Sequence, residues 1–414
     1  MLTKSPEADL RERVLLLEGI NASAVQILQS APSLNVERIA TALDEQSLGE
    51  MISEVGMLGI RSRTELTSNV IGKARKLLAV GCFSVGTNQV DLETARIKGI
   101  PVFNAPFSNT RSVAELVIGE IIMLFRGIFP KSVKAHAGQW EKSAAGRQEV
   151  RGRTLGIVGY GNIGSQLSTL AESLGMKVIY YDRYPKLRHG NAEPVESLTD
   201  LLAASDIVSL HVPDSASTHG MIGENELRAM KRGSYLINNS RGTVVDLGAL
   251  AAALRDRHIA GAAVDVFPVE PSSNSERFTC PLQGLDNVIL TPHIGGSTEE
   301  AQERIGLEVA RKMLDYITTG STIGAVNFPQ LQLPGRSIGT RFSYVHRNVP
   351  GVLRGLNEVF LHHDANILAQ HLETEDGIGY VVMDVDLAGR SVPDILDDIN
   401  AIDGTIKTRI LYEN

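Results

Sequence analysis

The chain has 414 residues, of which 43% are hydrophobic and 21% charged, and its formal net charge at pH 7 is −8. This length predicts about two to three globular domains, and the negative charge argues against a general nucleic-acid binder, which needs a basic face. Cys82 and Cys280 form neither a C-x-x-C pair nor a metal-ligand spacing. We therefore expect no metal and a reducing compartment. The charged first residues and the lack of long apolar runs predict no leader and no membrane contact, and therefore a cytoplasmic protein.

The first hundred residues alternate short apolar segments with helical ones, which predicts an α/β lobe. The segments typical of buried strands are Arg13–Glu18, Leu58–Arg63, Leu77–Gly81 and Ile100–Phe103. Ser112 and Glu115 then have the spacing of a capping box, and they predict the start of an apolar helix that runs through Phe125.

A glycine turn opens the next region, in the sequence Arg153-Thr-Leu-Gly-Ile-Val-Gly-Tyr-Gly-Asn-Ile-Gly164. Gly159 permits the tight turn, Gly161 lets backbone N–H groups approach a pyrophosphate, and Gly164 lets a helix pack on the sheet. Asp182 ends the following strand, 18 residues after Gly164, where its carboxylate can accept ribose hydroxyls. The order strand, turn, helix, strand and acid predicts a dinucleotide site with a preference for NAD.

Further strands and helices follow in alternation. The expected strands are 207–210, 234–238, 261–265 and 287–290, with a helix from Thr298 to about Tyr316. This pattern predicts a doubly wound parallel sheet, whose ligands lie at the carboxyl ends of the strands.

Pro334-Gly335 marks a linker and a candidate hinge. Beyond it the pattern is strand, helix, strand, strand, helix, strand, a ferredoxin-like βαββαβ plan. The fold class is therefore α/β, with two Rossmann-like lobes and a C-terminal ferredoxin-like module. We expect a substrate-binding domain of residues 1–108 and 298–333, a dinucleotide-binding domain of residues 109–297, and a third domain of residues 338–414.

Three polar residues follow expected strands of the second lobe: Arg241, Glu270 and His293. A neutral imidazole has the pKa range of a base for a hydroxyl proton, and a nearby carboxylate stabilises the imidazolium that forms. A guanidinium can hold a substrate carboxylate through two parallel hydrogen bonds. Together they indicate a hydroxyacid oxidoreductase.

The segments Arg-Gly-Thr-Val-Val-Asp246, Ala-Val-Asp-Val-Phe267 and Thr-Pro-His-Ile-Gly-Gly-Ser297 resemble signatures of the D-isomer-specific 2-hydroxyacid dehydrogenases. The chain is most similar to the D-3-phosphoglycerate dehydrogenases that carry a C-terminal ACT domain, and the resemblance covers nearly all of it. It implies that Arg241 orients the substrate carboxylate, His293 is the acid/base and Glu270 its partner. It also implies further contacts to NAD, from Asn162, Ile163, Asn239, Ser240, Asp265, Gly295 and Gly296.

Two arginines separated by one residue, in Arg61-Ser62-Arg63, suit a dianionic phosphate. The resemblance implies that this loop binds the substrate phosphate together with Asn109 and Lys142. Some relatives carry a lysine where this chain has Ala40, so one of their phosphate contacts stays open here.

The resemblance implies that ACT modules pair edge to edge and bind serine at the seam, through His346, Asn348 and Asn366. The expected activity is NAD-dependent oxidation of 3-phospho-D-glycerate to 3-phosphohydroxypyruvate, the first step of serine synthesis. The enzyme would be a homo-oligomer, expected to be a tetramer, under feedback by serine. Two alternatives stay open: a general 2-oxoacid or hydroxypyruvate reductase, with 2-oxoglutarate as a side substrate, and an NAD-sensing corepressor of the same fold.

Overall fold

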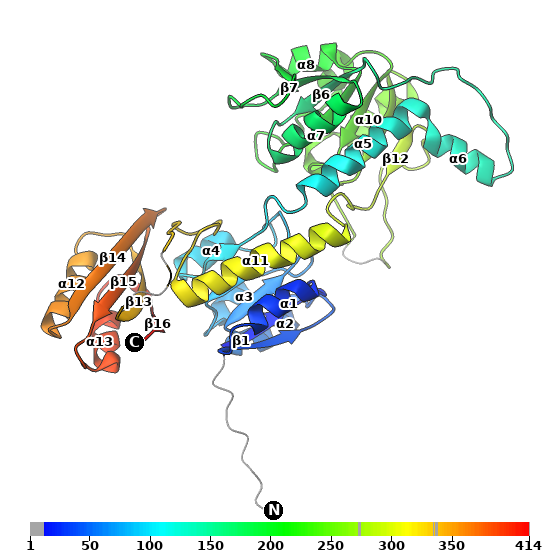
Figure 1. Ribbon diagram of the computed structural model, residues 1–414. Helices are drawn as coiled ribbons and strands as arrows, with labels where there is room; N and C mark the ends of the chain where they lie inside the picture. The colour runs from blue at the N-terminus through cyan, green and yellow to red at the C-terminus, as the bar shows by residue number, and fades with distance from the viewer. Residues whose placement is uncertain (1–11, 272–274, 334, 336–337, 414) are drawn as a thin grey trace, which may run out of the picture. The chain divides into compact units, whose positions relative to one another are not determined.

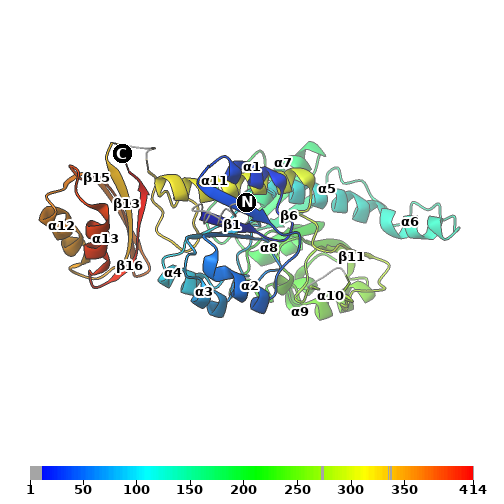
Figure 2. The same ribbon diagram turned by 90° about the horizontal axis from the view of Figure 1, so that it is seen from below.

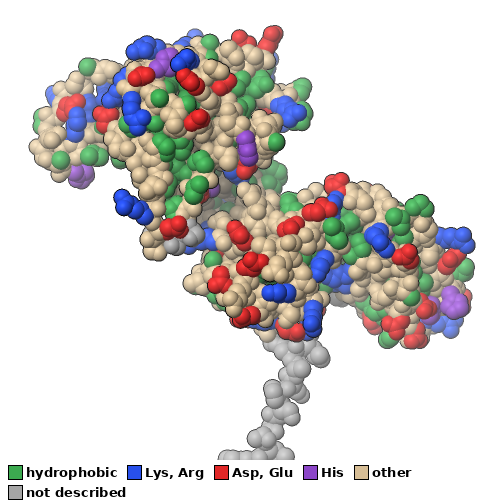
Figure 3. Space-filling view, turned by 180° about the vertical axis from the view of Figure 1, so that it is seen from behind, with side chains coloured by type: hydrophobic (Ala, Val, Ile, Leu, Met, Phe, Trp, Pro, Cys, Tyr) green, Lys and Arg blue, Asp and Glu red, His purple; other side chains and the backbone are tan. Residues whose placement is uncertain are grey.

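The computed structural model describes residues 12–271, 275–333, 335 and 338–413 (Figure 1). The chain divides into two compact units, one made of Met1–Ser108 with Gln302–Asn414 and the other of Asn109–Ala301. Within the described residues, no helix is both long enough and apolar enough to cross a membrane. On the face shown in Figure 3, acidic and basic side chains are interspersed.

The first unit contains a five-stranded parallel sheet in the order β2-β1-β3-β4-β5. The strands are β1 (Glu12–Leu16), β2 (Leu34–Arg38), β3 (Met57–Ile60), β4 (Ala79–Cys82) and β5 (Val102–Phe103). Every residue of β3 and β4 is buried, as expected for parallel strands covered on both faces. The helices of this sheet are α1 (Ala22–Gln29), α2 (Glu45–Met51), α3 (Ser68–Lys73) and α4 (Leu92–Ile97). The side chains of Asn21, Asp44, Thr67 and Asp91 cap them.

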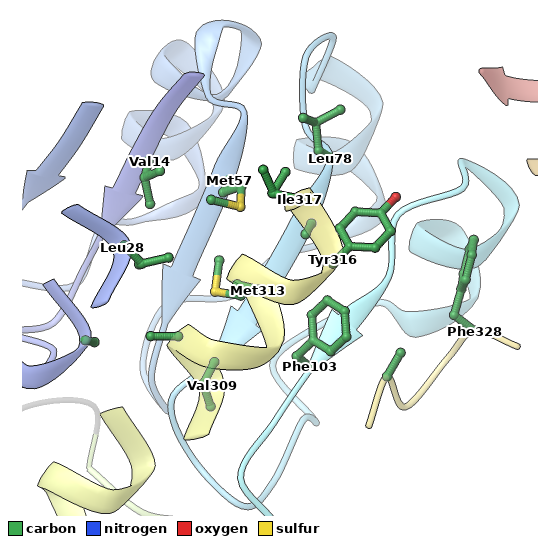
Figure 4. Close-up of a cluster of buried hydrophobic side chains, with 14 of the residues drawn as sticks. Val14, Leu28, Met57, Leu78, Phe103, Val309, Met313, Tyr316, Ile317 and Phe328 are labelled. Carbon is green, nitrogen blue, oxygen red and sulfur yellow. The ribbon is translucent and has the colours of Figure 1, made fainter. Parts of the chain in front are cut away.

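The long helix α11 (Glu299–Thr319) packs on this sheet (Figure 4). Its residues Met313 and Tyr316 are fully or almost fully buried in a cluster with Phe103. A Cβ atom on Gly81 would lie 2.4 Å from the Met313 sulfur, so the missing side chain of β4 lets the helix approach closely.

The C-terminal module has six elements. They are β13 (Thr340–Arg347), α12 (Val352–His362), β14 (Asn366–Glu375), β15 (Ile378–Asp386), α13 (Val392–Asn400) and β16 (Thr405–Tyr412). The sheet is antiparallel in the order β14-β15-β13-β16, and both helices cover one face of it (Figures 1 and 2). The other face joins the cluster around α11, where Tyr380 meets Phe328 edge to face and donates to the Gly320 carbonyl at 2.7 Å.

The second unit contains a seven-stranded parallel sheet in the order β12-β11-β10-β9-β6-β7-β8. The strands are β6 (Thr154–Val158), β7 (Lys177–Tyr181), β8 (Glu193–Pro194), β9 (Ile207–Leu210), β10 (Ser234–Asn238), β11 (Ile259–Val264) and β12 (Val288–Leu290). Its helices are α5 (Thr110–Arg126), α6 (Ile128–His136), α7 (Asn162–Ser173), α8 (Leu198–Ala204), α9 (Glu224–Ala229) and α10 (Leu247–Arg255). The strand order reverses beside β6, which is where an open α/β sheet binds ligands.

The predicted fold class is confirmed by these sheets. The capping box at Ser112 and Glu115 is wrong, because α5 begins earlier, at Thr110. The Ser112 hydroxyl instead pairs with the Thr298 hydroxyl at 2.8 Å, and Glu115 pairs with Arg111 one turn before it. A tertiary contact therefore uses the side chain that the local pattern assigned to a cap. Pro334 of the predicted hinge lies outside the described residues.

Candidate active site

The glycine turn lies between β6 and α7. Gly159 has φ +91°, and a Cβ there would lie 2.4 Å from the His211 carbonyl oxygen. A Cβ on Gly164 would lie 2.3 Å from the Gly159 carbonyl oxygen, whereas one on Gly161 would meet no atom within 4 Å. Two glycines thus close the turn and the third borders open space at the start of α7, where Asn162 and Ile163 lie. This geometry fits the pyrophosphate of a dinucleotide.

Asp182 follows β7 and is tied to the same turn. One carboxylate oxygen accepts the Tyr160 N–H at 2.8 Å and the other accepts the Tyr184 N–H at 3.0 Å. Each oxygen keeps a further lone pair for a hydroxyl. The residues present therefore fit a dinucleotide with free ribose hydroxyls.

His293 and Glu270 form a hydrogen-bonded pair, with 2.8 Å between Nδ1 of the imidazole and Oε2 of the carboxylate. The other Glu270 oxygen accepts the Phe267 N–H at 3.0 Å, which fixes the carboxylate. Since Nδ1–H donates to Glu270, Nε2 is the nitrogen available as a base.

The pKa values of this pair are shifted by its geometry. The hydrogen bond and the charge of Glu270 raise the pKa of His293, against a lowering by burial. Burial alone would raise the pKa of Glu270, but the hydrogen bond and charge of His293 outweigh it and lower that pKa. The pair therefore favours the protonated imidazole beside a charged carboxylate.

The positive charge of Arg241 contributes to lowering the pKa of both Glu270 and His293. Its guanidinium donates to the Ser240 carbonyl oxygen at 2.7 Å. The three residues follow β10, β11 and β12, which are neighbours in the sheet. The parallel order therefore gathers them at one edge, as the sequence predicted for strand ends.

Asp265 organises the turn that carries His293. Its buried carboxylate accepts the Thr291 hydroxyl at 2.6 Å and the N–H groups of Ile294 and Gly295 at 2.8 Å each. The His293 N–H donates to the Asp265 carbonyl oxygen at 2.8 Å, and His293 itself has φ +53°. Left-handed backbone at a non-glycine residue is unfavourable, so Asp265 holds the imidazole in a conformation that the chain would not adopt alone.

Asn109 lies against the same loop, because a Cβ on Gly296 would be 2.8 Å from its side-chain nitrogen. The Asn109 side-chain oxygen is buried without a hydrogen-bond partner. Lys142 is exposed on the segment after α6, and the hydrogen bonds that order the His293 turn do not include it.

Glu120 is a residue of this unit that sequence reasoning missed. It is fully buried on α5 and accepts the Asn239 side-chain N–H at 3.0 Å. Burial raises its pKa to about 8. The remaining oxygens of Glu120 and Asn239 are both buried without a partner. In the sequence, the only sign of Glu120 was a single acidic residue within an apolar helix, and this did not show that its side chain is buried.

Ser240, next to Asn239 in the chain, donates its hydroxyl to the Asn238 side-chain oxygen.

In the first unit, Arg61, Ser62 and Arg63 form the loop after β3, with Arg61 half-buried and the other two exposed. Burial lowers the pKa of Arg61. The structure thus places two guanidinium groups on one short loop, as the sequence predicted.

The residues expected to bind an effector are divided within one module. His346 is buried, its Nδ1 bonds to the Arg347 carbonyl oxygen at 2.8 Å, and its Nε2 has no partner. His346 pairs with Gly379 of β15, whereas Asn366 pairs with Asp386 at the other end of that strand. Asn348 follows β13 and is exposed. A single copy therefore does not bring His346 and Asn366 together.

Comparisons with known proteins agree with this geometry. Residues 118–295 match the model of the D-isomer specific 2-hydroxyacid dehydrogenase, NAD binding domain, and residues 342–407 match the AHAS small subunit-like ACT domain. D-3-phosphoglycerate dehydrogenase from Escherichia coli (strain K12) is 55% identical over 400 residues, 97% of each chain. The chain belongs to the D-3-phosphoglycerate dehydrogenases.

Other D-3-phosphoglycerate dehydrogenases are similarly matched, such as that of Dictyostelium discoideum, 48% identical over 97% of each chain. Among solved structures, D-lactate dehydrogenase from Aquifex aeolicus complexed with NAD and lactic acid is 28% identical, with a TM-score of 0.67. The match covers 77% of this chain and 100% of that one. The cofactor of this enzyme is NAD.

Proposed function

We propose that this enzyme oxidises 3-phospho-D-glycerate to 3-phosphohydroxypyruvate with NAD, the first step of L-serine synthesis. The observation that carries the proposal is the His293–Glu270 pair with Arg241 at the ends of three neighbouring strands. This set supplies a base, its charged partner and a carboxylate anchor, which are the groups that oxidation of a 2-hydroxy acid requires.

In the proposed mechanism Arg241 holds the substrate carboxylate through paired hydrogen bonds. His293 accepts the proton of the C2 hydroxyl at Nε2, and Glu270 stabilises the imidazolium that results. NAD, when bound, supplies the acceptor for the hydride that leaves C2. The glycine turn, Asp182, Asn239 and Asp265 are the proposed holders of this cofactor, as are the other residues assigned to it from the sequence.

We propose that the enzyme selects its substrate by recognising the substrate's phosphate group. We propose that Arg61, Ser62 and Arg63 bind it, aided by Asn109 and Lys142. Guanidinium groups suit a dianionic phosphate because each offers several donors in a fixed plane. The two guanidinium groups carried by one short loop after β3 support an anionic ligand at Arg61 and Arg63.

For regulation we propose serine as the effector of a homo-oligomer, expected to be a tetramer. The separation of His346 from Asn366 along β15 supports a site shared by two modules, since one module offers only part of it. We propose the domain boundaries expected from the sequence, with residues 1–108 and 298–333 binding the substrate, residues 109–297 binding NAD and residues 338–414 regulating the enzyme. We also propose a cytoplasmic location, which the free thiols of Cys82 and Cys280 support.

The test compares initial rates of reduction of 3-phosphohydroxypyruvate and unphosphorylated hydroxypyruvate. Arg61→Ala and Arg63→Ala should each lower kcat/KM for the phosphorylated substrate by about 30-fold or more, because a shielded charge-assisted bond is lost. The rate with hydroxypyruvate should change little, and Arg75→Ala, at an exposed arginine of the same unit, serves as the control. Equal losses on both substrates would instead favour a general 2-oxoacid reductase. Absence of turnover with either would favour the NAD-sensing corepressor.

A further inference from the structure

The carboxylate of Glu18 binds the backbone of the loop that carries Arg61 and Arg63. One oxygen accepts the N–H of Arg61 at 2.9 Å and that of Thr64 at 3.0 Å. The other oxygen accepts the N–H of Arg63 at 3.0 Å. Three donors of one four-residue loop therefore converge on a single side chain, 43 to 46 residues away in the sequence.

The sheet explains how Glu18 reaches this loop. Glu18 lies just beyond β1 and the loop lies just beyond β3, and these two strands are hydrogen-bonded neighbours. The Leu17 N–H continues the pairing by donating to the Gly59 carbonyl oxygen at 2.9 Å. Both segments thus leave the same edge of the sheet, where a side chain of one can bind the backbone of the other.

Glu18 itself has an unusual backbone. Its φ is +58°, in the left-handed region that non-glycine residues rarely adopt. Its N–H donates to the Thr41 carbonyl oxygen at 3.1 Å. Such a conformation is unfavourable by itself, and the hydrogen bonds that Glu18 makes to the neighbouring loop offset its cost.

The charge of Glu18 also acts on the arginines. The pKa of Arg61 is lowered by burial and by the positive charge of Arg63, and the negative charge of Glu18 opposes this lowering. A further bond fixes the loop, from the Gln89 side-chain nitrogen to the Arg61 carbonyl oxygen. The loop is thus held on both its N–H and its C=O sides, and three of its N–H groups are already occupied. An anion bound at this loop would therefore be held mainly by the Arg61 and Arg63 side chains, since these three backbone N–H groups are already occupied.

We propose that Glu18 is the positioning residue that sets phosphate specificity, by holding the loop so that both guanidinium groups act on one phosphate. This inference rests on the proposed function, in which Arg61 and Arg63 bind the substrate phosphate.

The test is Glu18→Gln in the full-length enzyme. The amide keeps the size of the side chain but loses the charge, and its NH₂ group opposes a backbone N–H. We expect KM for 3-phosphohydroxypyruvate to rise about 10-fold or more, since hydrogen bonds to a charged group are lost. The kcat and KM for hydroxypyruvate and the KM for NADH should stay within about twofold. Inorganic phosphate should inhibit hydroxypyruvate reduction less strongly than in the wild type.

Glu37→Gln is the matched control, because Glu37 pairs with Arg13 at 2.7 Å in an exposed ion pair of the same unit. It should change none of these quantities. Glu18→Asp provides a second variant that keeps the charge while its shorter side chain cannot reach all three N–H groups. We expect it to lose part of the phosphate preference, between the wild type and Glu18→Gln.

The proposal is overturned if Glu18→Gln leaves the ratio of kcat/KM for the two substrates within twofold of the wild type. It is equally overturned if both Glu18 variants weaken both substrates alike, which would mark a purely structural role. Arg61→Ala and Arg63→Ala separate the two levels of inference. If they abolish the phosphate preference and the Glu18 variants do not, only the role of Glu18 fails. If they leave it unchanged, the phosphate site of the proposed function fails.

Discussion

Glu120→Gln tests a buried acid of the NAD-binding unit. Burial raises the pKa of Glu120 from 4.5 to about 8, so the folded chain keeps this proton over a pH range in which the unfolded chain has lost it. A group with a raised folded pKa contributes stability that is full below pH 4.5 and lost as the pH rises through about 8. Each pKa unit corresponds to about 1.4 kcal/mol. At pH 7 the acid therefore costs about 3 kcal/mol relative to a neutral side chain.

Glutamine should remove this cost, because its oxygen can accept the Asn239 N–H and its NH₂ group can donate to the unpartnered Asn239 oxygen. The assay is thermal unfolding of the full-length protein without cofactor, from pH 5 to pH 8.5. In the wild type the midpoint temperature at which this unit unfolds should fall as the pH rises, and in the variant it should fall much less. The two should differ by about 6 °C or more at pH 7, at about 2–4 °C per kcal/mol.

Glu115→Gln on the same helix is the control, since Glu115 is exposed and pairs with Arg111. Its melting temperatures should follow those of the wild type at every pH. Parallel curves for the wild type and Glu120→Gln would refute the reasoning, because they would mean that Glu120 ionises as freely in the folded chain as in the unfolded one.

Four further predictions concern the cofactor, the base and its partner, and the effector. NAD should give a higher kcat/KM than NADP, because the Asp182 carboxylate repels a 2′-phosphate; an equal or higher value with NADP would contradict this. His293→Ala should lower kcat by about 10²–10⁴-fold. Glu270→Gln should move the pH profile of hydroxyacid oxidation to lower pH, because Glu270 raises the pKa of His293, and an unshifted profile would remove Glu270 from that role. Asn366→Ala should weaken inhibition by serine without changing kcat or KM in its absence, and undiminished inhibition would place the effector elsewhere.

The sequence by itself determined the local elements and the class of cofactor. The glycine turn and Asp182 lie within one strand-turn-helix-strand unit, whose conformation follows from the backbone preferences of glycine and from the apolar pattern of neighbouring residues. The strands at 207–210 and 234–238 match β9 and β10 for the same reason. The positions of Arg241, Glu270 and His293 after strands were visible in the sequence because strands alternate with helices.

Only the tertiary structure decided which side chains meet. Strand order placed Glu270 against His293, 23 residues apart, and Glu18 against the loop of Arg61, 43 residues apart. The tertiary structure also pairs the Ser112 hydroxyl with the Thr298 hydroxyl, where the local pattern had predicted a helix cap. These contacts depend on which strands are neighbours in the folded sheet and on which polar groups are buried away from water. Short-range backbone preferences do not encode either property.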